Sequence, residues 1–383
     1  MSVRKREWIT SKGEPREAWV VDYVDQQSVR HIKTFDRKKE ADAYEDSVGV
    51  DVRAGVHTSS KKTVAEAGKN WIAACEAHGL EAATIESYRQ HLNDHIVPYL
   101  GNVKLAQLTV PGVRAFMDKL RAEKRSPAMV KRVVGDLGSI LSDAQERGDV
   151  AQNVVRSLSK RKKRRAGERR QKGKLKVGVD IPTPAEIKAI VGHLQGRWRP
   201  LLLTAIFAGL RASEIRGLRW EDVDLKKAIL HVRQRADKFK VIGKPKSEAG
   251  ERTIPMPPIL VNSLREWKLR CPKSELGLCF PTGEGNVEYH SNIVVRGLAP
   301  VQVAAGVVTK GNAKYTGLHS LRHFYASWCI NRKEDGGLGL PLKVVQHRLG
   351  HSSIQMTADV YGHLFGNGDD GTELAAAEKA LLG

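Results

Sequence analysis

Two arginines, two histidines and a tyrosine in this 383-residue chain match metal-independent cleavage of a phosphodiester in nucleic acid. His319 and Arg322 lie in a His-Ser-Leu-Arg-His motif, and His351 follows in Leu-Gly-His. Tyr361 comes ten residues later, and Arg211 lies far upstream in Gly-Leu-Arg-Ala-Ser-Glu-Ile. A guanidinium fits phosphate oxygens, an imidazole moves protons near neutral pH, and a phenol can attack phosphorus. The set therefore predicts phosphoryl transfer with the tyrosine as nucleophile.

The histidines also have spacings that occur in zinc sites. His319 and His323 are four residues apart, and so are His347 and His351. Each pair can therefore lie on one side of a helix and bind a metal. Neither pair contains the glutamate of a His-Glu-x-x-His motif, and Arg322 would place a cation beside the metal. We therefore expect neither a metal nor another cofactor.

The strings around these residues resemble those of the tyrosine recombinase (phage integrase) family. Ala-Gly-Leu-Arg-Ala-Ser-Glu-Ile resembles the first arginine box of the family, and His-Ser-Leu-Arg-His a common form of the second. The resemblance implies that Arg211 and Arg322 hold the phosphate and that Tyr361 attacks it. His319 would hydrogen-bond a phosphate oxygen or accept the tyrosine proton. His351 would stabilise the transferring phosphate.

Three more residues gain a role from this resemblance. Lys246 lies in Lys-Pro-Lys-Ser-Glu-Ala-Gly-Glu-Arg-Thr-Ile-Pro and matches the family's hairpin lysine, which would protonate the leaving 5′-oxygen. Lys244 is a competing candidate, and contact with phosphate is an alternative role. Glu214 would support the first arginine box, and His323 would buttress the site from beneath.

The composition limits the partner and the compartment. The net charge of +21 and the pI of about 9.8 favour a polyanionic partner, nucleic acid before an anionic membrane. No apolar run approaches the roughly 20 residues of a membrane span, and the charged N-terminus lacks a secretory signal. The four cysteines are scattered and form no Cys-x-x-Cys pair. We expect a reduced, cytoplasmic protein of a bacterial cell, with no membrane partner.

We expect a multidomain α+β fold, with a small domain of sheet and helix over residues 1–60. Strand-forming residues at 18–24 and 29–35 flank a polar turn. Arg30 and Lys33 would carry charge on one sheet face, either to contact DNA or to face solvent. The segment resembles the arm-type DNA-binding domain of phage integrases, whose small sheet enters the major groove.

Residues 61–160 predict an all-α domain of four helices, with start signals at Thr63, Thr109 and Ser126. The domain resembles the family's core-binding domain. Residues 161–180 predict a basic linker that would lie along DNA phosphates, with a plain flexible linker or a nuclear-localisation signal as alternatives. Candidate DNA contacts at the start of this linker and in the residue before it are Lys160, Arg161, Lys162, Lys163, Arg164 and Arg165.

Residues 181–365 predict the catalytic domain, mainly α with a small antiparallel sheet. A helix opens at Thr183, and a buried helix over 201–210 ends near Gly209. Residues 366–383 predict a glycine-rich break and an amphipathic helix. This tail would pack on its own molecule or, as in the family, dock on a neighbouring protomer.

The resemblance implies strand exchange between two DNA sites through a 3′-phosphotyrosine bond, which integrates and excises a mobile element. The expected partners are double-stranded DNA with core and arm sites, a homotetramer of otherwise monomeric chains, a directionality factor (excisionase) and a host DNA-bending protein. A type IB topoisomerase and a non-catalytic DNA-binding regulator are the alternatives. The arm-like N-terminal domain argues against the first, and the complete set of site residues against the second.

Overall fold

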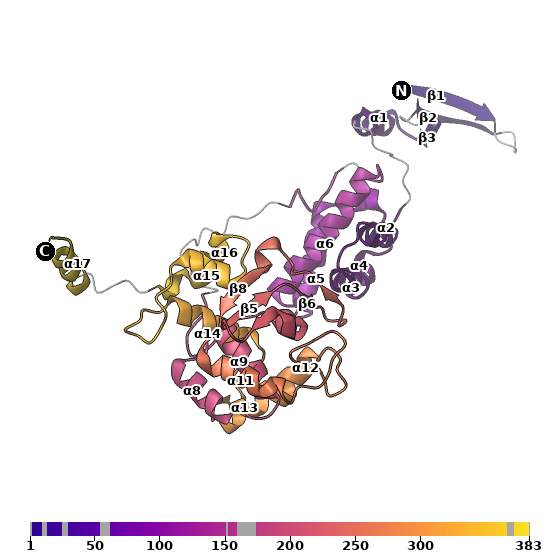
Figure 1. Ribbon diagram of the computed structural model, residues 1–383. Coiled ribbons are helices and arrows are strands. Elements are labelled where there is room, and N and C mark those ends of the chain that lie inside the picture. Colours follow the sequence, from indigo (N-terminus) through magenta and orange to yellow (C-terminus); the bar gives the residue numbers. More distant parts are fainter. Residues whose placement is uncertain are drawn as a thin grey trace. The chain divides into compact units, whose positions relative to one another are not determined.

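The computed structural model describes residues 2–9, 14–24, 30–53, 62–150, 152–158, 174–365 and 371–382 (Figure 1). The chain divides into two compact units, residues 1–162 and 163–383. Separate hydrophobic cores form in the N-terminal sheet, in the helices that follow it and in the second unit. The multidomain α+β fold predicted from the sequence is confirmed. The predicted DNA contacts at 160–165 lie outside the described residues.

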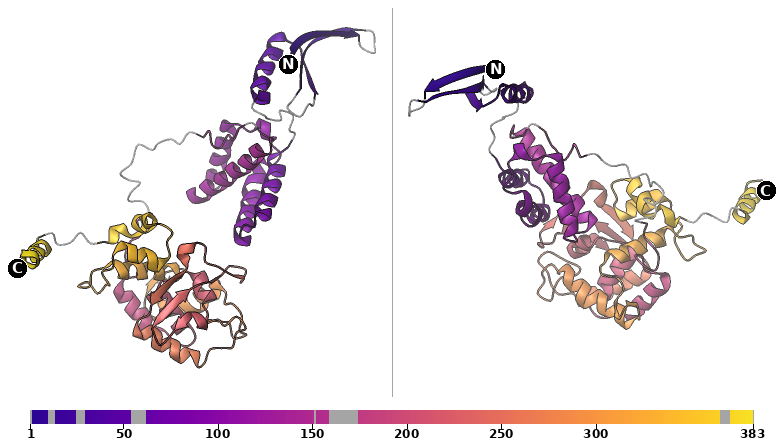
Figure 2. Two further views of the ribbon diagram at one scale, coloured as in Figure 1. Left: turned by 45° about the horizontal axis from the view of Figure 1, so that its top comes forward. Right: turned by 180° about the vertical axis from the view of Figure 1, so that it is seen from behind.

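The first unit begins with an antiparallel sheet whose strands follow chain order. These are β1 (Ser2–Ile9), β2 (Pro15–Val24) and β3 (Arg30–Phe35), and α1 (Lys38–Arg53) comes next. Figure 2 shows α1 along one face of the sheet, where Val21 and Tyr23 pack against Ala41 and Val48. β1 was not predicted, because its side chains are exposed apart from the half-buried Val3. Pairing along its whole length with β2 holds it in the sheet.

The prediction that Arg30 and Lys33 charge a single face of the sheet is wrong. Side chains alternate along a strand, so residues three apart point to opposite faces. Arg30 donates to Asp22 through Nε at 2.9 Å. The Lys33 ammonium instead lies 4.1 Å from the ring centroid of Tyr44, which belongs to α1.

The all-α part of the first unit contains the four predicted helical segments. They are α2 (Val64–Ala77), α3 (Ala82–Gln90) with its continuation α4 (Val97–Leu100), α5 (Val110–Ala122) and α6 (Pro127–Glu146). The predicted capping box at Thr63 is present, and Thr109 and Ser126 cap their helices. A π-helical turn joins α3 to α4 just before Pro98, where the proline lacks the N–H that a regular helix needs.

The second unit is mainly helical and holds short antiparallel strands. Its helices are α8 (Pro184–His193), α9 (Trp198–Ala208), α10 (Ala212–Gly217), α11 (Pro258–Lys268), α12 (His290–Asn292), α13 (Ala299–Ala304), α14 (His319–Ile330), α15 (Leu342–Leu349), α16 (Ile354–Tyr361) and α17 (Thr372–Leu382). Its strands are β4 (Val223–Asp224), β5 (Ile229–Val232), β6 (Arg235–Ala236), β7 (Ile242–Gly243), β8 (Arg252–Pro255), β9 (Val308–Thr309) and β10 (Asn312–Ala313). The sheets are β4-β5-β8, β6-β7 and β9-β10.

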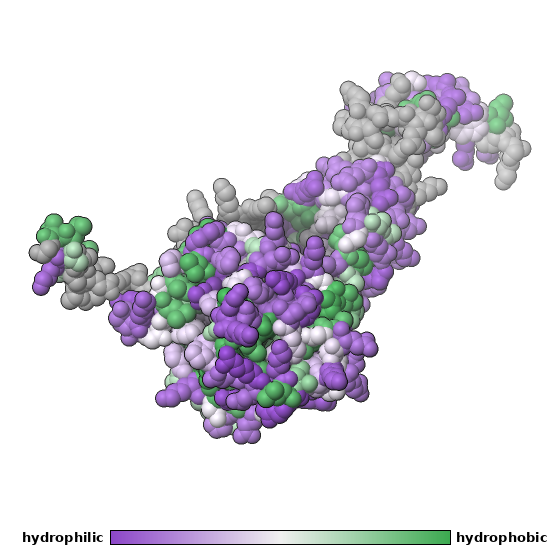
Figure 3. Space-filling model, viewed as in Figure 1, coloured by the Kyte–Doolittle hydropathy of each residue, from purple (hydrophilic) through white to green (hydrophobic). Residues whose placement is uncertain are grey.

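The core of the second unit forms around α9, which is buried along most of its length and packs against α11 and α14. The predicted end of this helix at Gly209 is confirmed. The tail helix α17 exposes hydrophobic side chains, drawn green in Figure 3, of which Leu374, Leu381 and Leu382 are 73%, 84% and 75% exposed. Among the described residues, no helix is long and apolar enough to cross a membrane.

Candidate active site

Arg211 is the N-cap residue of α10 and follows the tight turn that ends α9. Gly209 has a φ of 60°, and a Cβ there would lie 2.2 Å from the ring of Tyr325, so this position requires glycine. The backbone N–H and Nη1 of Arg211 donate to the two oxygens of Glu214, both at 2.8 Å. Nη2 donates to the carbonyl of Gly350 at 2.9 Å. The arginine thereby joins two segments that are far apart in the sequence.

Glu214 is a buried anion, with 2% of its side chain exposed. Besides Arg211, it binds Arg252, whose Nη1 and Nη2 donate to its two oxygens at 3.1 and 2.9 Å. Burial opposes ionisation, but Arg252, followed by Arg211 and Arg322, lowers the pKa of Glu214 to about 2. The carboxylate therefore stays ionised at neutral pH and orients two arginines.

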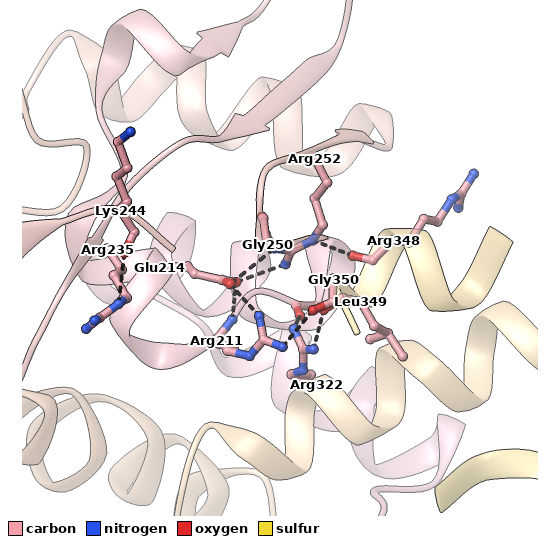
Figure 4. A network of polar contacts seen from close by, with 11 residues as sticks. Arg211, Glu214, Arg235, Lys244, Gly250, Arg252, Arg322, Arg348, Leu349 and Gly350 are labelled. Atoms are coloured by element: carbon pink, nitrogen blue, oxygen red, sulfur yellow. Dashed lines mark hydrogen bonds and ion pairs between the residues drawn. The ribbon is translucent and has the colours of Figure 1, made fainter. Parts of the chain in front are cut away.

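Three arginines donate to three successive carbonyls at the C-terminal end of α15 (Figure 4). The pairs are Arg252 with Arg348, Arg322 with Leu349, and Arg211 with Gly350. The last carbonyls of a helix lack intrahelical partners and carry partial negative charge, so cations stabilise this end. The helix end in turn fixes where each guanidinium lies.

By whole-residue surface, Arg322 is the innermost of these cations, with 1% exposed against 5% for Arg252. Its Nη1 donates to the carbonyl of Gly209 at 2.7 Å. Burial, and next the charge of Arg211, lowers the pKa of Arg322 to about 9, so the side chain stays charged at neutral pH. Arg211 is 31% exposed and open to solvent. Arg211 therefore presents an accessible guanidinium to an anion that enters from outside, and the buried charge of Arg322 adds to the attraction.

Tyr361 ends α16 and is 1% exposed. A hydrogen bond of 2.7 Å joins its hydroxyl to Nδ1 of His323. Burial raises the pKa of Tyr361 to about 12, although Arg322 and Arg211 act in the opposite direction. The phenol is therefore neutral near pH 7 and must lose its proton if it attacks phosphorus.

The three predicted histidines lie around this tyrosine in different ways. His323 contacts the hydroxyl, whereas the exposed His319 packs edge-on against the His323 ring at 4.5 Å between centroids. The ring of His351 is parallel to the tyrosine ring at 6.3 Å, and its Nδ1 shares a hydrogen bond of 2.9 Å with the Thr357 hydroxyl. Burial first, and neighbouring charges second, lower the pKa of both His323 and His351 to about 4. Both rings are therefore neutral near pH 7.

Lys246 and Lys244 are exposed in the connection between β7 and β8. The sequence predicted a hairpin tip here, but β7 pairs with β6 and β8 with β5, so the connection joins two sheets. The carbonyl of Lys244 accepts from Nε of Arg235 at 3.1 Å. At the other end, the carbonyl of Gly250 accepts from Nη1 of Arg252 at 2.9 Å, which links this loop to the arginines of the site.

Sequence reasoning missed Arg252 as a site residue and used it only to align the Arg-Thr-Ile-Pro string. A usable signal was present, because Ile254 is two residues away and Arg252 must share its buried face of β8. A buried cation needs a buried partner, which Glu214 supplies. Among the described residues, no group of three or more His, Cys, Asp or Glu side chains is placed to hold a metal ion.

Sequence comparisons identify relatives of this chain. Two family models match, "Phage integrase family" over residues 183–367 and "Phage integrase, N-terminal SAM-like domain" over 63–121. A tyrosine recombinase XerC-like protein of Caldanaerobacter subterraneus subsp. tengcongensis is 25% identical over 354 residues, 85% of this chain and 86% of the relative. Prophage integrase IntR of Escherichia coli is 24% identical over 271 residues, 66% of this chain and 61% of the relative.

Solved structures share the fold. The Tn1549 transposon integrase in complex with transposon right end DNA gives a TM-score of 0.63 at 16% identity, over 84% of this chain and 100% of that one. A lambda integrase tetramer bound to a Holliday junction gives 0.57 at 15% identity, over 91% and 95%. The two matched domains, the XerC-like relative and the shared fold agree: this chain belongs to the phage integrase family of tyrosine recombinases, enzymes of site-specific DNA recombination.

Proposed function

We propose that this recombinase cuts and rejoins double-stranded DNA through a 3′-phosphotyrosine bond and so integrates and excises a mobile element. The observation that carries the proposal is the buried Tyr361 hydroxyl, 2.7 Å from Nδ1 of His323 and within the field of Arg322 and Arg211. Attack on a phosphodiester requires a nucleophile, a neutral proton acceptor and fixed cations, and all three are present here.

In the proposed cleavage step, Oη of Tyr361 forms a bond to phosphorus while its proton passes to Nδ1 of His323. The bond between phosphorus and O5′ breaks, and the Lys246 ammonium gives its proton to O5′. The 5′-hydroxyl of a partner strand later attacks the phosphotyrosine, and these proton transfers reverse. Burial first, and then the charges of His319 and Arg322, lower the pKa of His323. The entering phosphate is an anion, so it counteracts these charges and makes the imidazole a stronger base.

The remaining site residues bind the phosphate in this proposal. Arg211 and Arg322 hold the non-bridging oxygens, and their positions are already set by helix-end carbonyls. His319 is exposed next to them and donates to a phosphate oxygen. His351 supports the tyrosine ring from its parallel face and contributes a further donor.

A nicked suicide DNA site tests the nucleophile. The unchanged protein should become covalently attached to the 3′ end at the nick, and peptide mapping should find the adduct on Tyr361. Tyr361→Phe should bind the same DNA and form no adduct. A surviving adduct in this variant would overturn the assignment. Binding without an adduct in the unchanged protein would favour a regulator, and relaxation without strand exchange would favour a topoisomerase.

For the N-terminal sheet we propose DNA contact through the face opposite α1. Arg30 and Arg4 flank Asp22 on that face, whereas Lys33 lies over an aromatic ring of α1 and is the weaker candidate. The basic residues 160–165 would contact DNA phosphates. Arg30→Gln should reduce the slope of log affinity against log salt on attachment-site DNA by about one, and Lys33→Gln should leave it unchanged. The reverse result would assign the contact to the other face.

We further propose that free monomers form a tetramer on DNA and that α17 docks on a neighbouring copy. The proposed acceptor for the exposed leucines of the tail is an apolar groove of about 390 Å³ in the second unit. The groove residues include Ile187, Val191, Phe207, Phe324 and Trp328. Deletion of residues 371–383 should abolish cross-linked tetramers on Holliday-junction DNA, and unchanged tetramers would contradict the docking. In this proposal the recombinase acts in the bacterial cytoplasm, together with a directionality factor and a host DNA-bending protein.

A further inference from the structure

Arg252 is a fully buried arginine whose hydrogen bonds join three other segments of the second unit, with 0% of its side chain exposed. Two of its bonds go to Glu214, one to the carbonyl of Arg348 at 2.8 Å, and one to the carbonyl of Gly250 at 2.9 Å. Glu214 orients Arg211, Arg348 lies in the last turn of α15, and Gly250 ends the loop that begins at Lys244 and carries Lys246. Figure 4 shows these partners around Arg252.

The Lys246 loop is held at both ends although the lysine itself is exposed. Nε of Arg235 donates to the carbonyl of Lys244, and Arg252 donates to the carbonyl of Gly250. The loop also closes on itself, because the N–H of Gly250 donates to the carbonyl of Ser247 at 2.8 Å. The loop is therefore fixed at its ends, and the lysine side chain is free to reach outward.

Glycine at position 250 allows this closed loop. A Cβ at Gly250 would lie 2.5 Å from Cβ of Pro245, the residue directly before Lys246. A side chain there would push the proline away and shift the lysine with it. The missing side chain of Gly250 and the hydrogen bond from Arg252 thus both hold the same loop, and either residue can be substituted without changing the other.

We propose that Arg252 is a positioning residue for the proton donor, and that it couples the place of Lys246 to the arginines that hold the phosphate. The inference rests on the proposed role of Lys246 as general acid. One buried guanidinium sets both the phosphate-binding arginine, through Glu214, and the loop of the acid, through Gly250. The ends of the Lys246 loop are therefore held relative to the phosphate-binding arginines before DNA enters.

The chemistry of the leaving group separates this role from a merely structural one. When the bond between phosphorus and O5′ breaks, the alkoxide needs a proton, which Lys246 supplies. When sulfur replaces O5′, the thiolate is a far weaker base and leaves without a proton. A variant that harms only the placement of the acid should therefore recover on the sulfur DNA.

The test compares single-turnover cleavage of two suicide DNAs, one with a bridging 5′-oxygen and one with a bridging 5′-sulfur. Arg252→Lys should lose about 100-fold on the oxygen DNA and regain at least about tenfold on the sulfur DNA, and the loss that remains comes from Arg211, which Glu214 then orients less firmly. The ratio of the two rates does not depend on the folded fraction of a preparation, because the same molecules cleave both. Gly250→Ala, which leaves Arg252 in place, should show the same selective recovery.

Two controls assign each failure to its source. Lys246→Ala should recover on the sulfur DNA, and Arg322→Lys should be equally impaired on both. If Lys246→Ala does not recover, the general-acid role fails and the inference fails with it. If Lys246→Ala recovers while Arg252→Lys and Gly250→Ala lose equally on both DNAs, the acid role stands and the positioning role of Arg252 is overturned.

Discussion

The arginine centre, made of Arg211, Arg252, Arg322 and Glu214, and the Lys246 loop are built in opposite ways. In the centre, each arginine binds a carbonyl at the end of α15, and Arg252 and Arg322 are 5% and 1% exposed as whole residues. In the loop, the lysine side chain is exposed and only the two loop ends are hydrogen-bonded to arginines.

The difference follows from what each part must do in the proposed reaction. Cations that stabilise charge on phosphorus work best when their positions are fixed beforehand, because no reorganisation is then needed during the reaction. A proton donor must instead follow an oxygen that moves away as its bond breaks. A fixed centre and an exposed side chain on an anchored loop satisfy both needs.

The largest effect is expected from the innermost cation. Arg322→Lys keeps a charge but cannot donate to the carbonyls of Gly209 and Leu349 and to a phosphate at the same time. Cleavage should fall by about 10³-fold, as for the loss of a fixed donor in a transition state. Single-turnover cleavage measures the loss, and filter binding should show DNA affinity within about threefold. A loss below about tenfold would mean that the centre is not rigid.

The next largest effect concerns the stability of the centre. Glu214→Gln leaves the cations of Arg211 and Arg252 without their shared anion, and removal of one partner from a buried ion pair costs about 3–5 kcal/mol. Urea unfolding should show this loss. Glu248→Gln, at an exposed position of the Lys246 loop, is the matched control and should change stability by less than about 0.5 kcal/mol. Equal effects would show that the arginines are held by the carbonyls alone.

How far the sequence predicted this centre depends on whether a residue belongs to a motif. Arg211, Glu214 and Arg322 were all selected from short strings, and the structure gathers them around one helix end. Arg252 was not selected, since its partners are a carboxylate 38 residues away and a carbonyl 96 residues away. A backbone carbonyl carries no side-chain signature, so no string could indicate that contact.

The pairing of the strands also depended on contacts between residues that are far apart in the sequence. The strand at 18–24, which lies in β2, was predicted from its β-branched and aromatic residues, whereas β1 is a run of mostly exposed side chains that its pairing with β2 holds in place. The loop of Lys246 was expected between two paired strands, yet β7 and β8 belong to different sheets. Strand partners are set by tertiary packing, which local patterns do not contain.

A smaller effect is expected from the histidines beside the nucleophile as pH falls. The pKa of His323 and that of His351 are about 4 in the folded protein, against about 6.5 in an unfolded chain. Between about pH 6.5 and 4 the unfolded chain therefore binds protons that the folded protein does not, so stability is lost as pH falls through this window. His323→Gln removes one such group, so its urea midpoint should fall less steeply between pH 7 and 4.5. Equal pH slopes of the urea midpoint in the two proteins would mean that His323 binds its proton as readily in the folded protein as in the unfolded chain.

The smallest effect should come from the other lysine of the exposed loop. Lys244 contributes its backbone carbonyl, which accepts from Arg235, and this contact survives Lys244→Ala. Oxygen-DNA cleavage should therefore fall less than about threefold, from the loss of one attraction to phosphate. Lys246→Ala should lose at least about 100-fold in the same assay. A larger loss in Lys244→Ala that sulfur restores would transfer the role of acid to Lys244. Because Lys244 is tied to Arg235 rather than Arg252, that result would also separate the acid from the arginine centre.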